Sequence, residues 1–163
     1  LLSLDNIKQM IYMRVAVETM VLRDFMEIQT PMVMEEIRHA IAVQKALIQT
    51  PGFEPEQFYR MDAQMHSLWF TAVKRQKLWD MLQAQQLHYT RFRMLDFITE
   101  TDFPRIIGEH EQLFELICKK DLSGLEQVLK DHLYYSMKRM RHSIEVDYKD
   151  YFEEEPEENR FVI

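Results

Sequence analysis

Residues 58–66 read Phe-Tyr-Arg-Met-Asp-Ala-Gln-Met-His, and the interpretation of the whole chain starts from this stretch. Apolar side chains recur in and after it at the spacing of one helix face, at Phe58, Met61, Met65, Leu68 and Ala72. Asp62 and His66 are four residues apart, which places them one helical turn apart beside this apolar stripe. The stretch therefore predicts an amphipathic helix, beginning near Glu54 and Pro55, that directs a carboxylate and an imidazole toward the interior.

The rest of the sequence shows the same helical periodicity in five further segments. We predict these helices at roughly residues 4–25, 31–49, 76–98, 103–119 and 122–148. Two of them begin with a capping side chain and a proline in the first turn, namely Thr30 with Pro31 and Asp102 with Pro104. The links between segments are short, which is typical of neighbouring helices in a bundle.

The composition also favours a helical fold. Of 163 residues 47% are hydrophobic, so the chain can bury a core, yet it contains only 3 glycines and 5 prolines. Sheets joined by tight turns usually need more glycine than this, whereas bundles with short links do not. We predict an all-α fold, an antiparallel bundle of six or seven helices. It occupies residues 1–150 as one domain, and residues 151–163 form an acidic tail.

Charge and apolar runs narrow the classes of partner. The formal net charge of -7 argues against nucleic-acid contact by these residues themselves. No apolar run is long enough to span a membrane and no signal peptide is visible, so we expect a cytoplasmic protein without a membrane partner. The single cysteine, Cys118, leaves no intrachain disulfide to form. Because it lies in an apolar stretch, we predict it to be a small core residue.

Two more histidines lie on apolar helix faces. His110 lies between Ile106 and Leu113, and His132 follows Leu129 on the last predicted helix. Three helices thus each direct a potential ligand at the interior. Burying three imidazoles beside a carboxylate costs free energy unless they share a partner, and a divalent metal is such a partner. The spacing alone leaves open whether these are separate hydrogen-bonded core residues or one metal site made by Asp62, His66, His110 and His132.

Three functions are compared with these candidate ligands. A ferritin-like di-iron oxidase needs two Glu-x-x-His motifs and two further glutamates, and only Glu36 and His39 have that spacing. A mononuclear hydrolase needs a general base beside its metal; Glu109 adjoins His110, but adjacent helix positions point in different directions. A metal-free dimerisation module predicts that apolar replacement of His110 or His132 leaves stability unchanged or improved. No nucleophile motif is present, and we expect no enzyme activity.

The quoted stretch and three others resemble the FCD class of GntR-type transcription regulators, the FadR C-terminal-domain type. Besides residues 58–66, the resemblance rests on Glu109-His110 with Leu113 and Ile117, and on Asp131-His132-Leu133. It rests also on residues 12–18, Tyr-Met-Arg-Val-Ala-Val-Glu, which look like the Arg-x-x-x-Glu pattern of the family's first helix. The resemblance covers nearly the whole chain in the expected order.

This resemblance implies a sensor. Many family members hold a divalent metal with an Asp and a His one turn apart and two later His, and these roles fall on Asp62, His66, His110 and His132. Zinc is the metal we expect, with nickel or manganese as alternatives. The resemblance also implies a small carboxylate effector and a homodimer. DNA binding would belong to an N-terminal winged helix-turn-helix domain that is absent here, so we infer that the chain is the effector-binding and dimerisation part of a longer parent.

Three residues are candidates for binding the effector. Arg14 lies on an apolar part of the first predicted helix, where a buried guanidinium needs an anion. It either binds the effector carboxylate or pairs with Glu18 one turn on, and the sequence leaves both open. Arg91 and Arg93 lie on the segment 76–98, and the sequence is compatible with a position in a pocket wall or on the surface for each. Of the two, we assign Arg91 to the pocket. Tyr135 is the third candidate, as a source of a hydroxyl group.

Overall fold

The computed structural model describes residues 1–85, 87–99 and 102–154, and helices dominate this part of the chain. The helices are α1 (Leu4–Ile28), α2 (Pro31–Ile48), α3 (Pro55–Ala72), α4 (Gln76–Gln85), α5 (Leu87–Ile98), α6 (Phe103–Lys119), α7 (Leu122–Arg139), the short α8 (Arg141–Glu145) and the 3-10 helix η1 (Lys149–Tyr151). One isolated parallel bridge joins Leu2 to Phe152. The prediction of an all-α bundle is confirmed.

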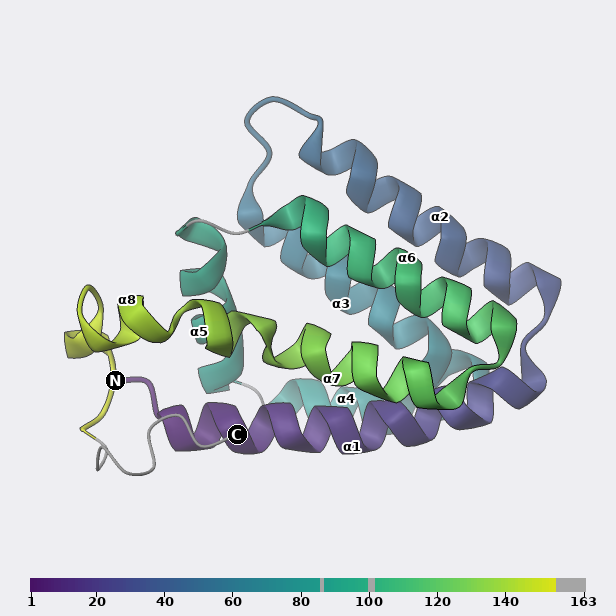
Figure 1. The fold of residues 1–163 in the computed structure, drawn as a ribbon, viewed down its shortest axis with the longest axis horizontal. Helices are drawn as coiled ribbons and strands as arrows, with labels where there is room; N and C mark the ends of the chain where they lie inside the picture. The colour runs from purple at the N-terminus through teal and green to yellow at the C-terminus, as the bar shows by residue number, and fades with distance from the viewer. Residues whose placement is uncertain (86, 100–101, 155–163) are drawn as a thin grey trace.

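The long helices form a bundle around a shared interior (Figure 1). The α7 helix packs between α1 and α6, α2 packs on α6 and α3, and α3 packs back on α1, which closes the bundle. The α5 helix runs steeply across one end and packs on α1 and α3. Side chains that point inward from α3, α6 and α7 therefore meet in the middle of the molecule.

Helix starts follow the capping residues of the sequence. The Thr30 side chain accepts a hydrogen bond from the backbone amide of Val33 at 3.4 Å, and Pro31 occupies the first turn of α2. Asp102 does the same for the amide of Arg105 at 3.0 Å at the start of α6. Local side-chain chemistry thus fixes where α2 and α6 begin, and with them the register of α6 against the interior.

Two predicted helices are each divided in the structure. The segment 76–98 was predicted as one helix, but α4 ends at Gln85 and α5 begins at Leu87 with a different direction (Figure 1). The segment 122–148 divides at Met140 into α7 and α8. Neither division has a proline or glycine, so the sequence carries no breaker. Packing decides instead, because α4 lies on α3 whereas α5 also has to reach α1.

The α3 helix buries one face along its whole length. Phe58, Met65, Trp69 and Phe70 are at most 1% exposed, and Asp62 and His66 are buried on the same face. At its first turn Phe58 joins an aromatic cluster, which we define as Phe53, Phe58, Phe97 and Phe103. The ring centroids of Phe58 and Phe103 are 4.7 Å apart in an edge-to-face arrangement. One helix thus carries both an apolar cluster and a polar centre.

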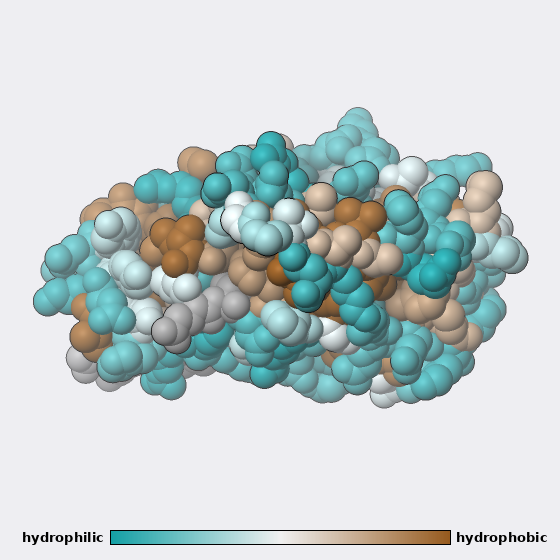
Figure 2. Space-filling view, turned by 90° about the horizontal axis from the view of Figure 1, so that it is seen from above, coloured by the Kyte–Doolittle hydropathy of each residue, from teal (hydrophilic) through white to brown (hydrophobic). Residues whose placement is uncertain are grey.

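The outer surface is mainly hydrophilic, with apolar side chains in separate patches, as Figure 2 shows for the face seen from above. Cys118 lies on this surface, so its prediction as a core residue is wrong. Its neighbour Ile117 takes the buried position on α6, since adjacent helix residues point about 100° apart. Within the described residues, none of the helices is both long and apolar enough to cross a membrane.

Candidate metal centre

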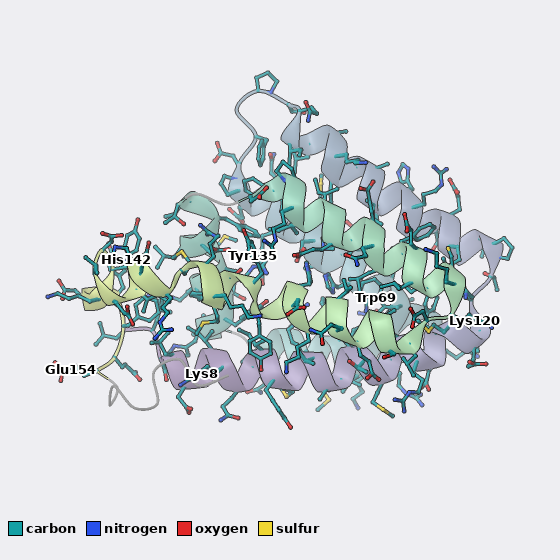
Figure 3. All side chains as sticks on the ribbon, viewed as in Figure 1. Lys8, Trp69, Lys120, Tyr135, His142 and Glu154 are labelled. Atoms are coloured by element: carbon teal, nitrogen blue, oxygen red, sulfur yellow. The ribbon has the colours of Figure 1, made fainter. Side chains whose placement is uncertain are left out.

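Four buried side chains from three helices converge in the bundle interior. Asp62 and His66 come from α3, His110 from α6 and His132 from α7, and all four are buried. Each offers one ligand atom, and these atoms all lie within 4.8 Å of one another. Figure 3 shows nitrogen- and oxygen-bearing side chains gathered between these helices. The structure thus brings together the four residues that the sequence analysis assigned to a metal.

The imidazole Nε2 atoms form the middle of this cluster. Nε2 of His132 lies 3.3 Å from Nε2 of His66 and 3.3 Å from Nε2 of His110. Nε2 of His110 lies 3.2 Å from Oδ1 of Asp62. Three ring nitrogens and one carboxylate oxygen therefore face a common point.

The other nitrogen of each ring, Nδ1, is held by an oxygen outside the cluster. Nδ1 of His66 contacts Oε2 of Glu18 at 2.7 Å, and Nδ1 of His132 contacts Oε2 of Glu109 at 2.9 Å. In the same way, Nδ1 of His110 contacts Oε1 of Gln44 at 2.7 Å. Such outer partners fix the orientation and the tautomer of histidines that bind metals.

These outer contacts decide where the ring protons are. A carboxylate only accepts, so Nδ1 of His66 and of His132 must donate. The Gln44 amide nitrogen donates to the carbonyl oxygen of Met61 at 3.3 Å, so its oxygen accepts from Nδ1 of His110. Each neutral ring then presents an Nε2 lone pair to the centre. Lone pairs about 3.3 Å apart repel one another unless a cation lies between them, and the donor set fits a divalent metal.

Asp62 shows the same need for a cation. Its Oδ1 is buried and receives no hydrogen bond from the described residues, because the Nε2 atom of His110 beside it carries a lone pair. Its Oδ2 lies 3.9 Å from a guanidinium nitrogen of Arg93. Burial acts to raise the pKa of Asp62, and the nearby positive charge of Arg93 is among the effects that outweigh it, so the pKa is held well below the usual value. The carboxylate is ionised and available as a ligand.

Burial keeps His110 and His132 neutral. It lowers the pKa of His110 from 6.5 to about 4, although Asp62 acts in the opposite direction. It also lowers the pKa of His132, against the effect of Glu109. Neutral imidazole is the form that binds a metal, so the centre is ready for one at neutral pH without first losing protons.

Arg14 belongs to the support of His66. Its Nε donates to Oε1 of Glu18 at 2.7 Å, and its NH1 nitrogen donates to the hydroxyl of Tyr89 at 3.0 Å. Burial alone would raise the pKa of Glu18, but Arg14 and His66 lower it to about 2. The sequence left open whether Arg14 binds the effector or pairs with Glu18, and in the structure it forms an ion pair with Glu18.

Among the described residues, neither of the other effector candidates forms a hydrogen bond or ion pair with the four candidate ligands. Arg91 is exposed, about 200° around α5 from the buried Arg93. Tyr135 is half-buried, with the Arg105 guanidinium 4.0 Å above its ring. Arg93, by contrast, is 2% exposed, and its Nε and NH2 nitrogens have no hydrogen-bond partner among the described residues. Arg93 is the buried cation nearest the centre that still has unused donors.

Sequence reasoning missed Gln44 and named Arg93 without choosing it, although both residues had a signal. Gln44 follows Ile37 and Ile41 at helical spacing, so the pattern already placed it on the buried face of α2. Arg93 stands four residues after Tyr89 and one after Phe92, on a face that is apolar except for itself and Asp96. A polar residue on an apolar stripe was the signal in both cases, the same one that marked His110.

A comparison with protein families connects this geometry to a known class. The family model of the FCD domain matches residues 9–135, which is most of the chain and includes all four donors. The chain belongs to the FCD domain family. FCD domains are the effector-binding domains of GntR-type transcription regulators, as the resemblance implied. No curated protein matches the chain.

The FCD fold also explains why the first helix matters to the site. Glu18 ends the Arg-x-x-x-Glu pattern of α1, and it is the residue that holds His66. Glu109, which the sequence analysis weighed as a hydrolytic base, is hydrogen-bonded to His132 and to Arg105. Within this FCD domain both glutamates orient donors, and neither carboxylate faces the common point.

Proposed function

We propose that this FCD domain binds one divalent metal through Asp62, His66, His110 and His132 and senses a small carboxylate with it. One observation carries the proposal: all three imidazoles have the same arrangement. In each ring Nδ1 is hydrogen-bonded to an outer residue (Glu18, Gln44 or Glu109), and Nε2 faces the common point. Ordinary core histidines need one or two partners each. Three rings whose second nitrogens all face the same point need a cation there.

Zinc is the metal we propose, with nickel and manganese as the alternatives. Three imidazoles and one carboxylate suit all three ions, so availability contributes to which one is bound. When bound, such an ion acts as a Lewis acid toward an anionic ligand. The four residues supply one negative charge, which leaves a divalent centre about one unit positive and favours an anion beside it.

Arg93 is the residue we propose to bind the effector carboxylate, in place of Arg91. Its unused Nε and NH2 donors are buried, and unsatisfied buried donors of a cation cost free energy that an anion would recover. It lies beside Asp62, so an anion bound at the metal would have this guanidinium as a neighbour. Arg14 has its donors occupied by Glu18 and Tyr89, and we propose for it an indirect role through His66.

Elemental analysis of the purified chain tests the metal. We expect about one equivalent of zinc per chain in the wild type and in His39→Ala, whose imidazole is exposed on α2. His110→Ala and His132→Ala should each lose it. A wild type that takes up no zinc, nickel or manganese on incubation contradicts the donor assignment.

Thermal shift of the zinc-loaded chain with simple acids, from acetate to citrate, tests the effector residue. The wild type and Arg91→Gln should be stabilised by the same acids, because Arg91 is exposed. Arg93→Gln should bind zinc and lose the response to the acids. Equal shifts in Arg93→Gln and wild type would show that the anion is held elsewhere.

In the whole regulator, we propose that this signal modulates DNA binding by a separate winged helix-turn-helix domain, with the FCD domain as a homodimer. The FCD family supports the regulatory role. The di-iron and hydrolase alternatives have less support, since the described residues show a single donor group with one carboxylate and Glu109 already holds His132. The metal-free module would need the facing Nε2 lone pairs to be tolerated without a cation.

A further inference from the structure

The α5 helix connects the candidate metal centre to the first residues of the chain. At its start, Nδ1 of His88 accepts a hydrogen bond from the backbone amide of Ser3 at 3.2 Å. One and a half turns later Arg93 approaches Asp62 to 3.9 Å. A displacement of α5 that followed a change at Asp62 would therefore reach Ser3 through a direct contact.

The other end of α5 is held to α7 by buried polar contacts. The hydroxyl of Ser136 donates to Oδ2 of Asp96 at 2.9 Å, and the Arg139 guanidinium forms an ion pair with Oδ1. Arg139 also donates to the backbone oxygen of Asp96 at 3.1 Å. Asp96 is completely buried, so these contacts lie in a low-dielectric region where charge interactions are strong.

The contacts to Arg139 lead back to the start of the chain. Arg139 ends α7, and α8 and η1 carry the chain from there to Phe152, beside Leu2. The Leu2 amide donates to the carbonyl of Tyr151 at 2.7 Å, and the Glu153 amide donates to the carbonyl of Leu2 at 2.9 Å. The first residues are therefore held by α5 on one side and by the segment after α8 on the other.

Arg93 is attracted by two carboxylates, Asp62 across the contact with α3 and Asp96 on its own helix. Burial acts to lower the pKa of Arg93, but Tyr89, Asp62 and Asp96 raise it, and Asp96 stands three residues away on the same helix face. A metal at the centre draws the charge of Asp62 to itself. The attraction of Arg93 on α5 for Asp62 on α3 then weakens, and the ion pair of Asp96 with Arg139 on α7 becomes the dominant charged contact of α5. Occupancy of the centre thus changes the forces on α5 through residues that do not bind the metal.

We propose that α5 transmits occupancy of the centre to residues Leu2 and Ser3 through the charge sequence Asp62, Arg93, Asp96 and Arg139. The inference rests on the proposed metal site and adds its regulation. A ligand shifts a conformational equilibrium only if its contacts differ between the two states. The contact that differs here is the ion pair between Arg93 and Asp62, which is weaker when a metal is bound to Asp62. With its charged contact to α3 weakened, α5 is held mainly by Ser136 and Arg139 on α7 when the metal is bound, and the first residues are held more tightly.

The test is hydrogen exchange of the isotopically labelled chain, followed by NMR with and without one equivalent of zinc. Three backbone amides report on how firmly the first residues are bound to α5 and to the segment after α8, namely those of Leu2, Ser3 and Glu153. In the wild type, zinc should slow their exchange by about fivefold or more, the lower end of typical coupling between sites. The same spectra show whether zinc is bound, through the imidazole signals of the centre.

Asp96→Asn isolates the relay, because it removes the charge and keeps the shape. It should bind one equivalent of zinc and lose most of the zinc-dependent slowing. Asp131→Asn is the matched control, since Asp131 accepts from Gln127 and Lys138 on the solvent side of α7, and it should behave as wild type. Should Asp96→Asn fail to fold, Ser136→Ala removes one donor to Asp96 without leaving a charge, and it should reduce the effect of zinc in part.

The outcomes separate this inference from the metal site itself. Zinc bound at one equivalent without a change at the three amides contradicts the relay and leaves the site intact. The relay is also contradicted if zinc slows amide exchange in Asp96→Asn as much as in the wild type. The same holds for Ser136→Ala where it replaces an unfolded Asp96→Asn. Loss of zinc binding in Asp96→Asn contradicts the relay as well. Failure of the wild type to bind zinc removes both proposals.

Discussion

Two regions of α3 show how differently buried side chains act. The aromatic cluster at its first turn is apolar and packs ring edge against ring face. One turn on, Asp62 and then His66 enter a centre where charges and lone pairs face one another. The cluster stabilises the fold with or without a bound ion, whereas the buried carboxylate and facing lone pairs of the centre cost free energy unless a cation offsets them. Under the proposed function, stability and sensing are divided along a single helix, and each prediction below separates the two regions.

The largest effect is expected in the aromatic cluster. Phe58→Ala removes a completely buried ring, and we expect it to lower the free energy of unfolding by about 3–5 kcal/mol. Urea unfolding measures this, and zinc should not restore the loss. Met81→Ala, a truncation of an exposed side chain, should leave stability nearly unchanged. Rescue of Phe58→Ala by zinc would show that the two regions are not separate.

The pH dependence of the metal-free chain comes next. The pKa of His110 falls from 6.5 in the unfolded chain to about 4 in the fold. A lowered pKa gives stability that is present above pH 6.5 and is lost as the pH falls toward 4, because only the unfolded chain takes up the proton there. The loss should be about 3 kcal/mol. His110→Leu should flatten this part of the stability profile, and an unchanged profile would contradict the assignment.

Zinc should stabilise the centre by a comparable amount. At about a hundred times the dissociation constant, binding to the folded state adds about 2.7 kcal/mol to the free energy of unfolding. We expect this increase in the wild type and in His39→Leu, and none in His110→Leu. Without zinc, His110→Leu should be as stable as the wild type or more so, since it removes one of the opposed lone pairs. Denaturant titrations with and without a chelator check both statements.

The smallest effect is expected at Cys118. Its side chain is exposed, so Cys118→Ser should change the free energy of unfolding by less than about 0.5 kcal/mol. Chemical denaturation gives the value, and rapid labelling of the folded chain by a thiol reagent checks the exposure. A loss of several kcal/mol would return Cys118 to the core, where the sequence analysis placed it.

Much of the fold follows from residues near one another in sequence. Periodic apolar positions and the caps Thr30 and Asp102 fix the elements that they begin. The break at residues 85–87 has no local signal, because α5 changes direction to pack on α1 and α3. Cys118 was misplaced for a related reason: an apolar neighbourhood in sequence says less than the helix face, and Ile117 takes the inner position.

The candidate site divides in the same way. Asp62, His66, His110 and His132 stand on apolar stripes, so periodicity found them, and the structure brings their ligand atoms within 4.8 Å. Their partners were harder to find, since which oxygen reaches each Nδ1 depends on how α1 and α2 pack on α3, α6 and α7. Arg91 was chosen where Arg93 is buried, because adjacent polar residues on one helix cannot be ranked without its orientation.

The bridge between Leu2 and Phe152 has a consequence for chain topology. Paired backbones lie about 5 Å apart, so the path from Leu2 to Phe152 is nearly a closed loop. A short peptide can join these two positions, and the exposed turn at Thr50, Pro51 and Gly52 can then be opened to give new ends. A circularly permuted chain of this kind would keep every helix of the bundle. It would also place a fused reporter beside α3 while leaving the four donors in their original order in space.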